Sequence, residues 1–228
     1  MSSSLGFASG VLIATIAFEM MPKAIELGSV IIATGGFSSG FGAVYAFDLF
    51  VHHWRLAGRA SEQRRAVQLF YGRRRPRTGD VAVFAGGTSV EELIEGMAIG
   101  AGTIVDPGFG LMVALAIAID NISEGLSIGE TVRSESSAKE ETNTWEVLGW
   151  TSTIGLALLI SSLAGWFLLR GLPEDVLAFM FATGGGGMFY LTMTDLFPQA
   201  EARQYQESAA IANGVGFLVI FILSAQLS

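Results

Sequence analysis

The chain contains no cysteine and only two histidines among its 228 residues. Without cysteine there is no disulfide framework, no thiolate metal site and no cysteine nucleophile. Charged residues are also scarce, at 15% of the chain against about 25% in ordinary soluble domains. Hydrophobic residues make up 51%, and the mean hydropathy is +0.52. This composition excludes an ordinary soluble domain and indicates an integral membrane protein.

Apolar segments of roughly 20 residues, the length that crosses a hydrocarbon core, recur along nearly the whole chain. Hydropathy predicts seven helices, at 5–24, 28–51, 80–104, 108–131, 146–169, 174–197 and 206–227. All five prolines lie at helix ends or in loops, where a missing N–H costs least. The glycines fall inside apolar segments, and the Gly36-x-x-x-Gly40 step is typical of tight helix contacts. We therefore expect one all-α transmembrane domain, a helix bundle over residues 1–228.

Basic residues are concentrated in one predicted loop, over residues 53–79, where eight arginines lie between Arg55 and Arg77. Because Lys and Arg are enriched in cytoplasmic loops, this loop is expected in the cytoplasm. If successive helices cross the membrane in alternating directions from this loop, eleven of the thirteen basic residues lie inside, with the N-terminus inside and the C-terminus outside. We expect a multi-pass protein of the cell membrane in contact with the lipid bilayer, without a nucleic-acid partner; a homodimer is left open.

Two predicted helices carry matched acidic motifs. Residues 91–96 read Glu-Glu-Leu-Ile-Glu-Gly, and residues 120–125 read Asp-Asn-Ile-Ser-Glu-Gly. In each motif two acids are four residues apart and therefore share a helix face. A weaker similarity relates the first and sixth predicted helices, and it aligns Glu19 with Asp195 and Pro22 with Pro198. Both pairs of helices run antiparallel in the expected topology, as inverted repeats of transporters do, although chance similarity between glycine-rich helices is the alternative for the weaker pair.

The acids of the two motifs are expected at the middle of the membrane, because each motif begins about a dozen residues into its helix. A charged side chain at that depth costs roughly 2.5–3.5 kcal/mol, so five acids together approach about 12–17 kcal/mol. Every Lys and Arg lies in a predicted loop or at a helix end, so cations, protons and water remain to offset this cost. Facing carboxylates would suit a divalent ion, or two ions that share carboxylates. The alternative is a set of protonated acids that hold the bundle together without transport.

The motifs resemble those of the ZIP (Zrt- and Irt-like) divalent-metal transporters, whose fourth and fifth helices typically read His-Asn-x-Pro-Glu-Gly and His/Gln-Asn/Glu-x-Pro-Glu-Gly. The similarity continues at residues 18–24, which look like the second helix of that family, and at 195–200, which look like its seventh. By this alignment, we expect the chain to lack the first helix of the family. The resemblance implies a main transport site and an adjacent second ion position, formed respectively by Glu91, Glu95, Asp120 and Glu124, and by Glu92 and Asn121.

The chain also departs from the ZIP pattern, because Glu91 and Asp120 stand where imidazole or amide ligands are usual. Ile94 and Ser123 replace the motif prolines. Oxygen-only ligation favours harder ions such as manganese or ferrous iron, whereas the family implies zinc. We expect transport of zinc, iron or manganese toward the cytoplasm, with the metal as substrate, no prosthetic group and no enzymatic activity. Two alternatives stay open: a membrane enzyme with a carboxylate-bridged metal pair, and a metal-binding membrane protein that does not transport.

Two further pairs of residues are candidates for metal contact. His52 and His53 lie together at the expected cytoplasmic end of the second helix, where an interfacial pair without a ligand role is the other interpretation. Glu19 and Asp195 each precede a proline by three residues, near opposite membrane faces. They are candidate entrance and exit ligands, with helix capping or interfacial solvation as the alternative.

Overall fold

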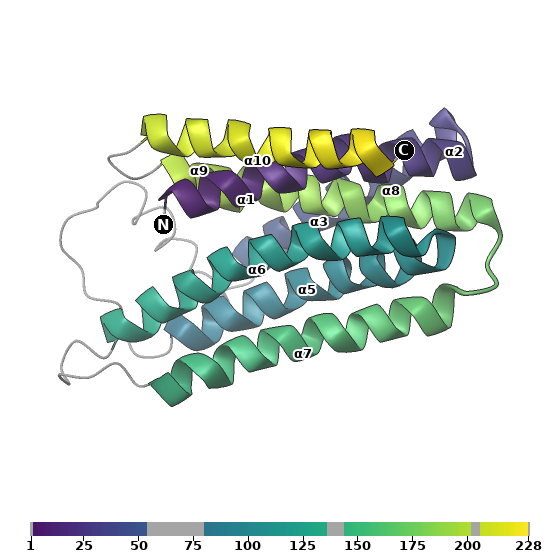
Figure 1. Cartoon of the computed structure of the whole chain (residues 1–228). Helices are drawn as coiled ribbons and strands as arrows, with labels where there is room; N and C mark the ends of the chain where they lie inside the picture. The colour runs from purple at the N-terminus through teal and green to yellow at the C-terminus, as the bar shows by residue number, and fades with distance from the viewer. Residues whose placement is uncertain (1, 54–79, 136–143, 202–205, 228) are drawn as a thin grey trace.

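The computed structural model describes residues 2–53, 80–135, 144–201 and 206–227, and these residues form long helices with no strand among them. The helices lie side by side in a bundle (Figure 1). Their bounds are α1 Ser2–Thr15, η1 Ile16–Met20, α2 Met21–Leu27, α3 Val30–His53, α5 Asp80–Val105, α6 Pro107–Glu135, α7 Thr144–Leu169, α8 Glu174–Leu191, η2 Thr192–Leu196, α9 Phe197–Glu201 and α10 Gln206–Leu227. Because α1, η1 and α2 run on without a break, as do α8, η2 and α9, each predicted helix has one counterpart. The predicted all-α bundle is confirmed.

Six of these helical segments are long and apolar enough to cross a membrane, counting only the described residues. The remaining helix, α5, has 26 residues, but three acids interrupt its apolar sequence. Large hydrophobic side chains are exposed along α7 and α10, as expected for helices that face lipid. The chain is therefore a multi-pass membrane protein. The predicted arginine-rich loop lies outside the described residues beyond His53, which ends α3.

A short π-helix interrupts two of the seven helical segments, η1 before Pro22 and η2 before Pro198. In each, the residue that follows the π-helix donates its N–H to the carbonyl five residues back. Proline has no N–H and its ring displaces the carbonyl four residues earlier, so a wider turn forms just upstream. The two π-helices occupy matching positions in the weaker predicted repeat, which agrees with a structural similarity between these helices.

Three pairs of parallel helices cross at glycines with the same register: α1 with α10, α3 with α8, and α5 with α7 (Figure 1). In each pair, the two glycines of a Gly-x-x-x-Gly step on the first helix face two backbone carbonyls of the second helix, which are four residues apart. The second helix has a glycine of its own three residues after the second of these carbonyls, and this glycine faces the first helix. The facing sets are Gly6 and Gly10 with Ala209, Asn213 and Gly216; Gly36 and Gly40 with Phe179, Thr183 and Gly186; Gly96 and Gly100 with Leu158, Ser162 and Gly165.

Backbone approaches backbone at each of these crossings. A Cβ atom at Gly10, Gly40 or Gly100 would overlap the carbonyl oxygen of the partner helix. Glycine is required there because only a bare Cα lets the helices come close enough for Cα–H groups to contact carbonyl oxygens. The predicted tight contact at Gly36-x-x-x-Gly40 is confirmed, and the same arrangement occurs twice more.

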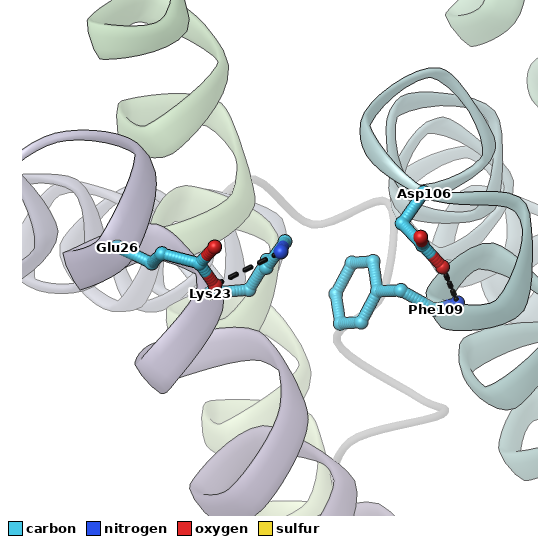
Figure 2. Close-up of polar contacts among 4 residues, drawn as sticks. All are labelled: Lys23, Glu26, Asp106 and Phe109. Carbon is cyan, nitrogen blue, oxygen red and sulfur yellow. Dashed lines mark hydrogen bonds and ion pairs between the residues drawn. The ribbon is translucent and has the colours of Figure 1, made fainter. Parts of the chain in front are cut away.

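A tight turn joins α5 to α6 and makes them antiparallel neighbours. Only Asp106 separates the two helices, and its Oδ1 accepts a hydrogen bond from the N–H of Phe109 at 2.8 Å. Figure 2 shows this cap together with the Lys23–Glu26 ion pair of α2. Asp106 is thus an N-cap, and Pro107 at the first helical position needs no N–H partner. This turn fixes which residues of the two motif helices face each other.

Candidate metal site

The two acidic motifs lie at the same level of the α5–α6 hairpin. The helices approach closely near the turn, where a Cβ at Gly102 would lie 3.1 Å from the Cα of Gly110. Glu92 is ten residues before Gly102, and Asp120 is ten residues after Gly110. At a rise of about 1.5 Å per residue, both lie about 15 Å from this contact. The hairpin therefore brings the two motifs opposite each other, as the sequence predicts.

Three of the five acids of the motifs are buried, and Glu91 and Glu124 are partly buried. Relative exposure is 0% for Glu92, 6% for Glu95 and 3% for Asp120. Asp120 is close enough to Glu92, Glu95 and Glu124 to interact electrostatically with each. Glu91 interacts in the same way with Glu95 and Glu124. The predicted acids therefore form one group in the interior of the bundle.

Five buried oxygen atoms within the described parts of the chain have no hydrogen-bond partner, and all five belong to the two motifs. They are both carboxylate oxygens of Glu92, Oδ1 of Asp120, Oδ1 of Asn121 and Oε2 of Glu124. Glu92 approaches Asn121 and Glu124 but does not reach hydrogen-bond geometry with either. Buried polar atoms are normally satisfied, so unpartnered oxygens in one place leave a role for a cation, protons or water.

These oxygens do not form a closed coordination shell. Among the described residues, no three acids or histidines converge in an arrangement that would hold a metal ion as they stand. The group is instead open, and an ion would be coordinated by rotation of these side chains together with water. An open set of oxygen ligands suits an ion that must both enter and leave, whereas a structural metal is held by a closed set.

A cavity with a mainly apolar lining lies beside the motif of α6, between α6 and α7. Its volume is about 80 Å³, and it is lined by Asn121, Glu124, Gly125, Thr151, Ile154 and Gly155. Since one water needs about 10–15 Å³ measured in this way, the cavity has room for several. Two of its lining residues, Asn121 and Glu124, carry unpartnered oxygens. The cavity therefore leaves space for water next to the acids.

Helix α7 also contacts the motif of α5. The hydroxyl of Ser161 donates to the backbone carbonyl of Glu92 at 2.9 Å, and Ser161 is only 4% exposed. Nothing in the sequence motifs pointed to Ser161 or Thr151, because both lie in an apolar helix whose single acid, Glu146, is in its first turn. The glycines at 96 and 100 were the available signal, since they indicate that another helix packs closely on the motif.

The remaining candidates stay as predictions. Glu19 lies in η1 and is partly buried, and Asp195 lies in η2. The side chains of His52, His53 and Asp195 lie outside the described part of the structure. No metal-binding role of these residues is tested by the geometry.

No protein-family model matches the chain. The chain is similar over its whole length to curated proteins named as zinc transporters. It is 24% identical to zinc transporter ZIP11 of Bos taurus, with 100% of the chain and 88% of the relative covered. It is 27% identical to zinc transporter ZupT of Corynebacterium efficiens, with 98% and 85% covered, and 23% identical to human ZIP11, with 100% and 88% covered. These similarities confirm the predicted relation to the ZIP transporters, at a divergent level.

Proposed function

We propose that this chain, a divergent member of the ZIP family, moves a divalent transition-metal cation across the membrane toward the cytoplasm. The observation that carries the proposal is the convergence of unpartnered buried oxygens on the two motifs of α5 and α6. The segment from Asp80 to Val132 contains no Lys or Arg that could neutralise these acids. A divalent cation offsets the cost of burying several carboxylates, and the relatives are named as zinc transporters.

The ion would exchange part of its water for carboxylate oxygens. Glu91, Glu95, Asp120 and Glu124 are the proposed main position, and Glu92 with Asn121 is the adjacent one. Glu124 also lines the cavity between α6 and α7, so a carboxylate that faces the acids also faces space for water. Stepwise replacement of water by oxygen ligands lowers the barrier to dehydration of the ion. The proposed direction rests on the resemblance to the ZIP family, and the expected cytoplasmic arginine loop indicates only which face of the bundle is cytoplasmic.

The choice of metal follows from the ligand atoms. The site offers carboxylate and amide oxygens, and the helices that carry it contain no histidine. Oxygen ligands suit manganese and ferrous iron, whereas zinc is more often bound by imidazole or thiolate. We propose manganese, ferrous iron and zinc as substrates, with a weaker preference for zinc than an imidazole site would have.

Metal uptake into proteoliposomes tests this function. The wild-type chain is compared with Glu95→Ala and Glu124→Ala, and Glu26→Ala serves as a matched control, since Glu26 is exposed and pairs only with Lys23 in the described structure. We expect both site variants to lose most uptake of manganese, iron and zinc, and the control to retain it. Equal uptake by all four proteins would overturn the assignment.

The same assay separates the two alternatives. Metal binding by the wild-type protein without uptake would favour a metal-binding membrane protein that does not transport. Turnover of an added organic substrate would favour an enzyme with a carboxylate-bridged metal pair. Such bundle sites usually contain Glu-x-x-His elements, which neither α5 nor α6 has.

A further inference from the structure

Ser161 of α7 forms a polar contact that reaches from another helix to the backbone of an acidic motif. Its hydroxyl lies 2.9 Å from the carbonyl oxygen of Glu92, and 3.0 Å from that of Leu158 in its own helix. A helix serine commonly bonds to its own backbone alone. The neighbouring Ser162 does so, with its hydroxyl 2.8 Å from the Leu158 carbonyl. Ser161 therefore differs from Ser162 in having a second acceptor on α5.

The space for this hydroxyl exists because residue 96 is glycine. A Cβ atom at Gly96 would overlap Oγ of Ser161 and would lie 2.6 Å from the Leu158 carbonyl oxygen. The motif glycine and the buried serine thus fit each other. Their contact fixes the position of α5 along α7 at the level of Glu92, because the hydroxyl reaches only one backbone carbonyl of α5.

The equivalent point of the second motif has no such contact. Gly125 corresponds to Gly96 in the internal repeat, and a Cβ there would meet only the methyl group of Thr151, at 3.8 Å. Glu92 is fully buried, whereas Asn121, at the corresponding position, is partly exposed to the cavity. Of these two corresponding side chains, the fully buried one belongs to the motif that α7 contacts closely.

We propose that Ser161 is a positioning residue for metal binding: by holding the backbone of Glu92 against α7, it keeps the Glu92 carboxylate in reach of Asn121 and Glu124. The inference rests on the proposed function of the site. A carboxylate with two unpartnered oxygens has no hydrogen bond of its own to fix its direction, so its backbone must do so. Groups that orient ligands change metal affinity by roughly 10–100-fold when they are removed.

The test compares Ser161→Ala with Ser162→Ala, two neighbouring substitutions of the same size. For each purified protein, manganese affinity is measured from metal-induced thermal stabilisation, and KM and maximal uptake are measured in proteoliposomes. We expect Ser161→Ala to weaken affinity and raise KM by roughly 10-fold, with maximal uptake nearly unchanged. Ser162→Ala should match the wild type, and Ser161→Cys, which keeps a weak donor, should recover part of the affinity.

Three results would overturn the inference. They are an unchanged affinity in Ser161→Ala, an equal loss of affinity in both alanine variants, and a loss of thermal stability without a change in manganese affinity. Because affinity is measured without transport, the inference is tested even if the wild-type protein binds manganese and shows no uptake. That outcome would count against the proposed transport function only.

Discussion

Helix α7 contacts the two motif helices in different ways. Against α5 it forms a closed interface, in which Gly96 and Gly100 face Ser161, Ser162 and Gly165 without room for a side chain. Against α6 it leaves a cavity lined by Gly125, and a Cβ at Gly125 or at Gly129 would meet little or nothing. Two motifs that match in sequence therefore have different surroundings. One is held in place, and the other opens onto space for water.

The largest expected difference is in stability, between Gly100→Ala and Gly129→Ala at equivalent positions of the repeat. A Cβ at Gly100 would lie 2.6 Å from the backbone N of Trp166, so the helices must separate at a cost of about 1–3 kcal/mol. A Cβ at Gly129 meets no atom within 4 Å, and alanine favours the helix by up to about 1 kcal/mol. We expect a lower thermal unfolding midpoint in detergent for the first variant only. Equal midpoints would show that α5 and α6 pack alike.

A smaller change is expected for Glu92→Gln, which removes the charge and keeps the shape of the side chain. Because both carboxylate oxygens are buried without a partner, the metal-free protein should gain about 1 kcal/mol of stability. The stabilisation caused by added manganese should fall at the same time. Thermal unfolding with and without manganese measures both effects.

Glu26→Gln is the control for the Glu92 variant, since this exposed side chain forms a surface ion pair with Lys23 at 2.9 Å. Such pairs contribute about 0–1 kcal/mol. We expect no gain in stability and no change in the response to manganese. A lower metal-free stability in Glu92→Gln would contradict the view that this carboxylate lacks a partner within the protein.

Thr151→Val tests the role of the cavity between α6 and α7. Thr151 lines the cavity together with Asn121 and Glu124, and its hydroxyl donates to the Val147 carbonyl at 2.9 Å. Valine keeps the shape of the side chain and removes this hydroxyl from the lining. We expect manganese uptake to fall several-fold with little change in unfolding temperature, because a drier cavity holds a hydrated ion less well. Thr153→Val is the matched control, since its hydroxyl bonds to the Gly149 carbonyl at 2.9 Å on the exposed side of α7. Equal uptake by both variants would exclude a role for the cavity.

The smallest effect is expected at the α1–α10 crossing, which has the same glycine register but no acidic motif. Asn213 donates from Nδ2 to the Ser9 hydroxyl at 2.7 Å. Hydrogen bonds between membrane helices contribute about 0.6 kcal/mol on average. Asn213→Ala should therefore lower stability slightly and leave manganese affinity unchanged. A loss of affinity as large as that of Ser161→Ala would mean that cross-helix bonds act on the site through general packing.

Much of the fold could be predicted because its signals are local. Apolar length gave the seven helices, and Pro22 and Pro198 marked the places where the helical pattern changes, although the π-helices beside them were not foreseen. The acidic motifs were recognised because five acids without basic partners are costly in an apolar segment. Ser161 and Thr151 were missed, because the contacts of a serine or threonine in an apolar helix depend on which helix packs against it, and the sequence does not show this.

The sequence by itself determined that this is a membrane bundle and that the acids of each motif share one helix face, because apolar length and the spacing of four residues act within a single helix. The tertiary structure decided which helix closes on which motif. The crossing of α5 with α7 depends on backbone contacts at Gly96 and Gly100, and the cavity depends on how far α6 lies from α7. Both are properties of pairs of helices, so two motifs that match in sequence have different surroundings: α7 packs closely on the motif of α5 and leaves a cavity beside the motif of α6.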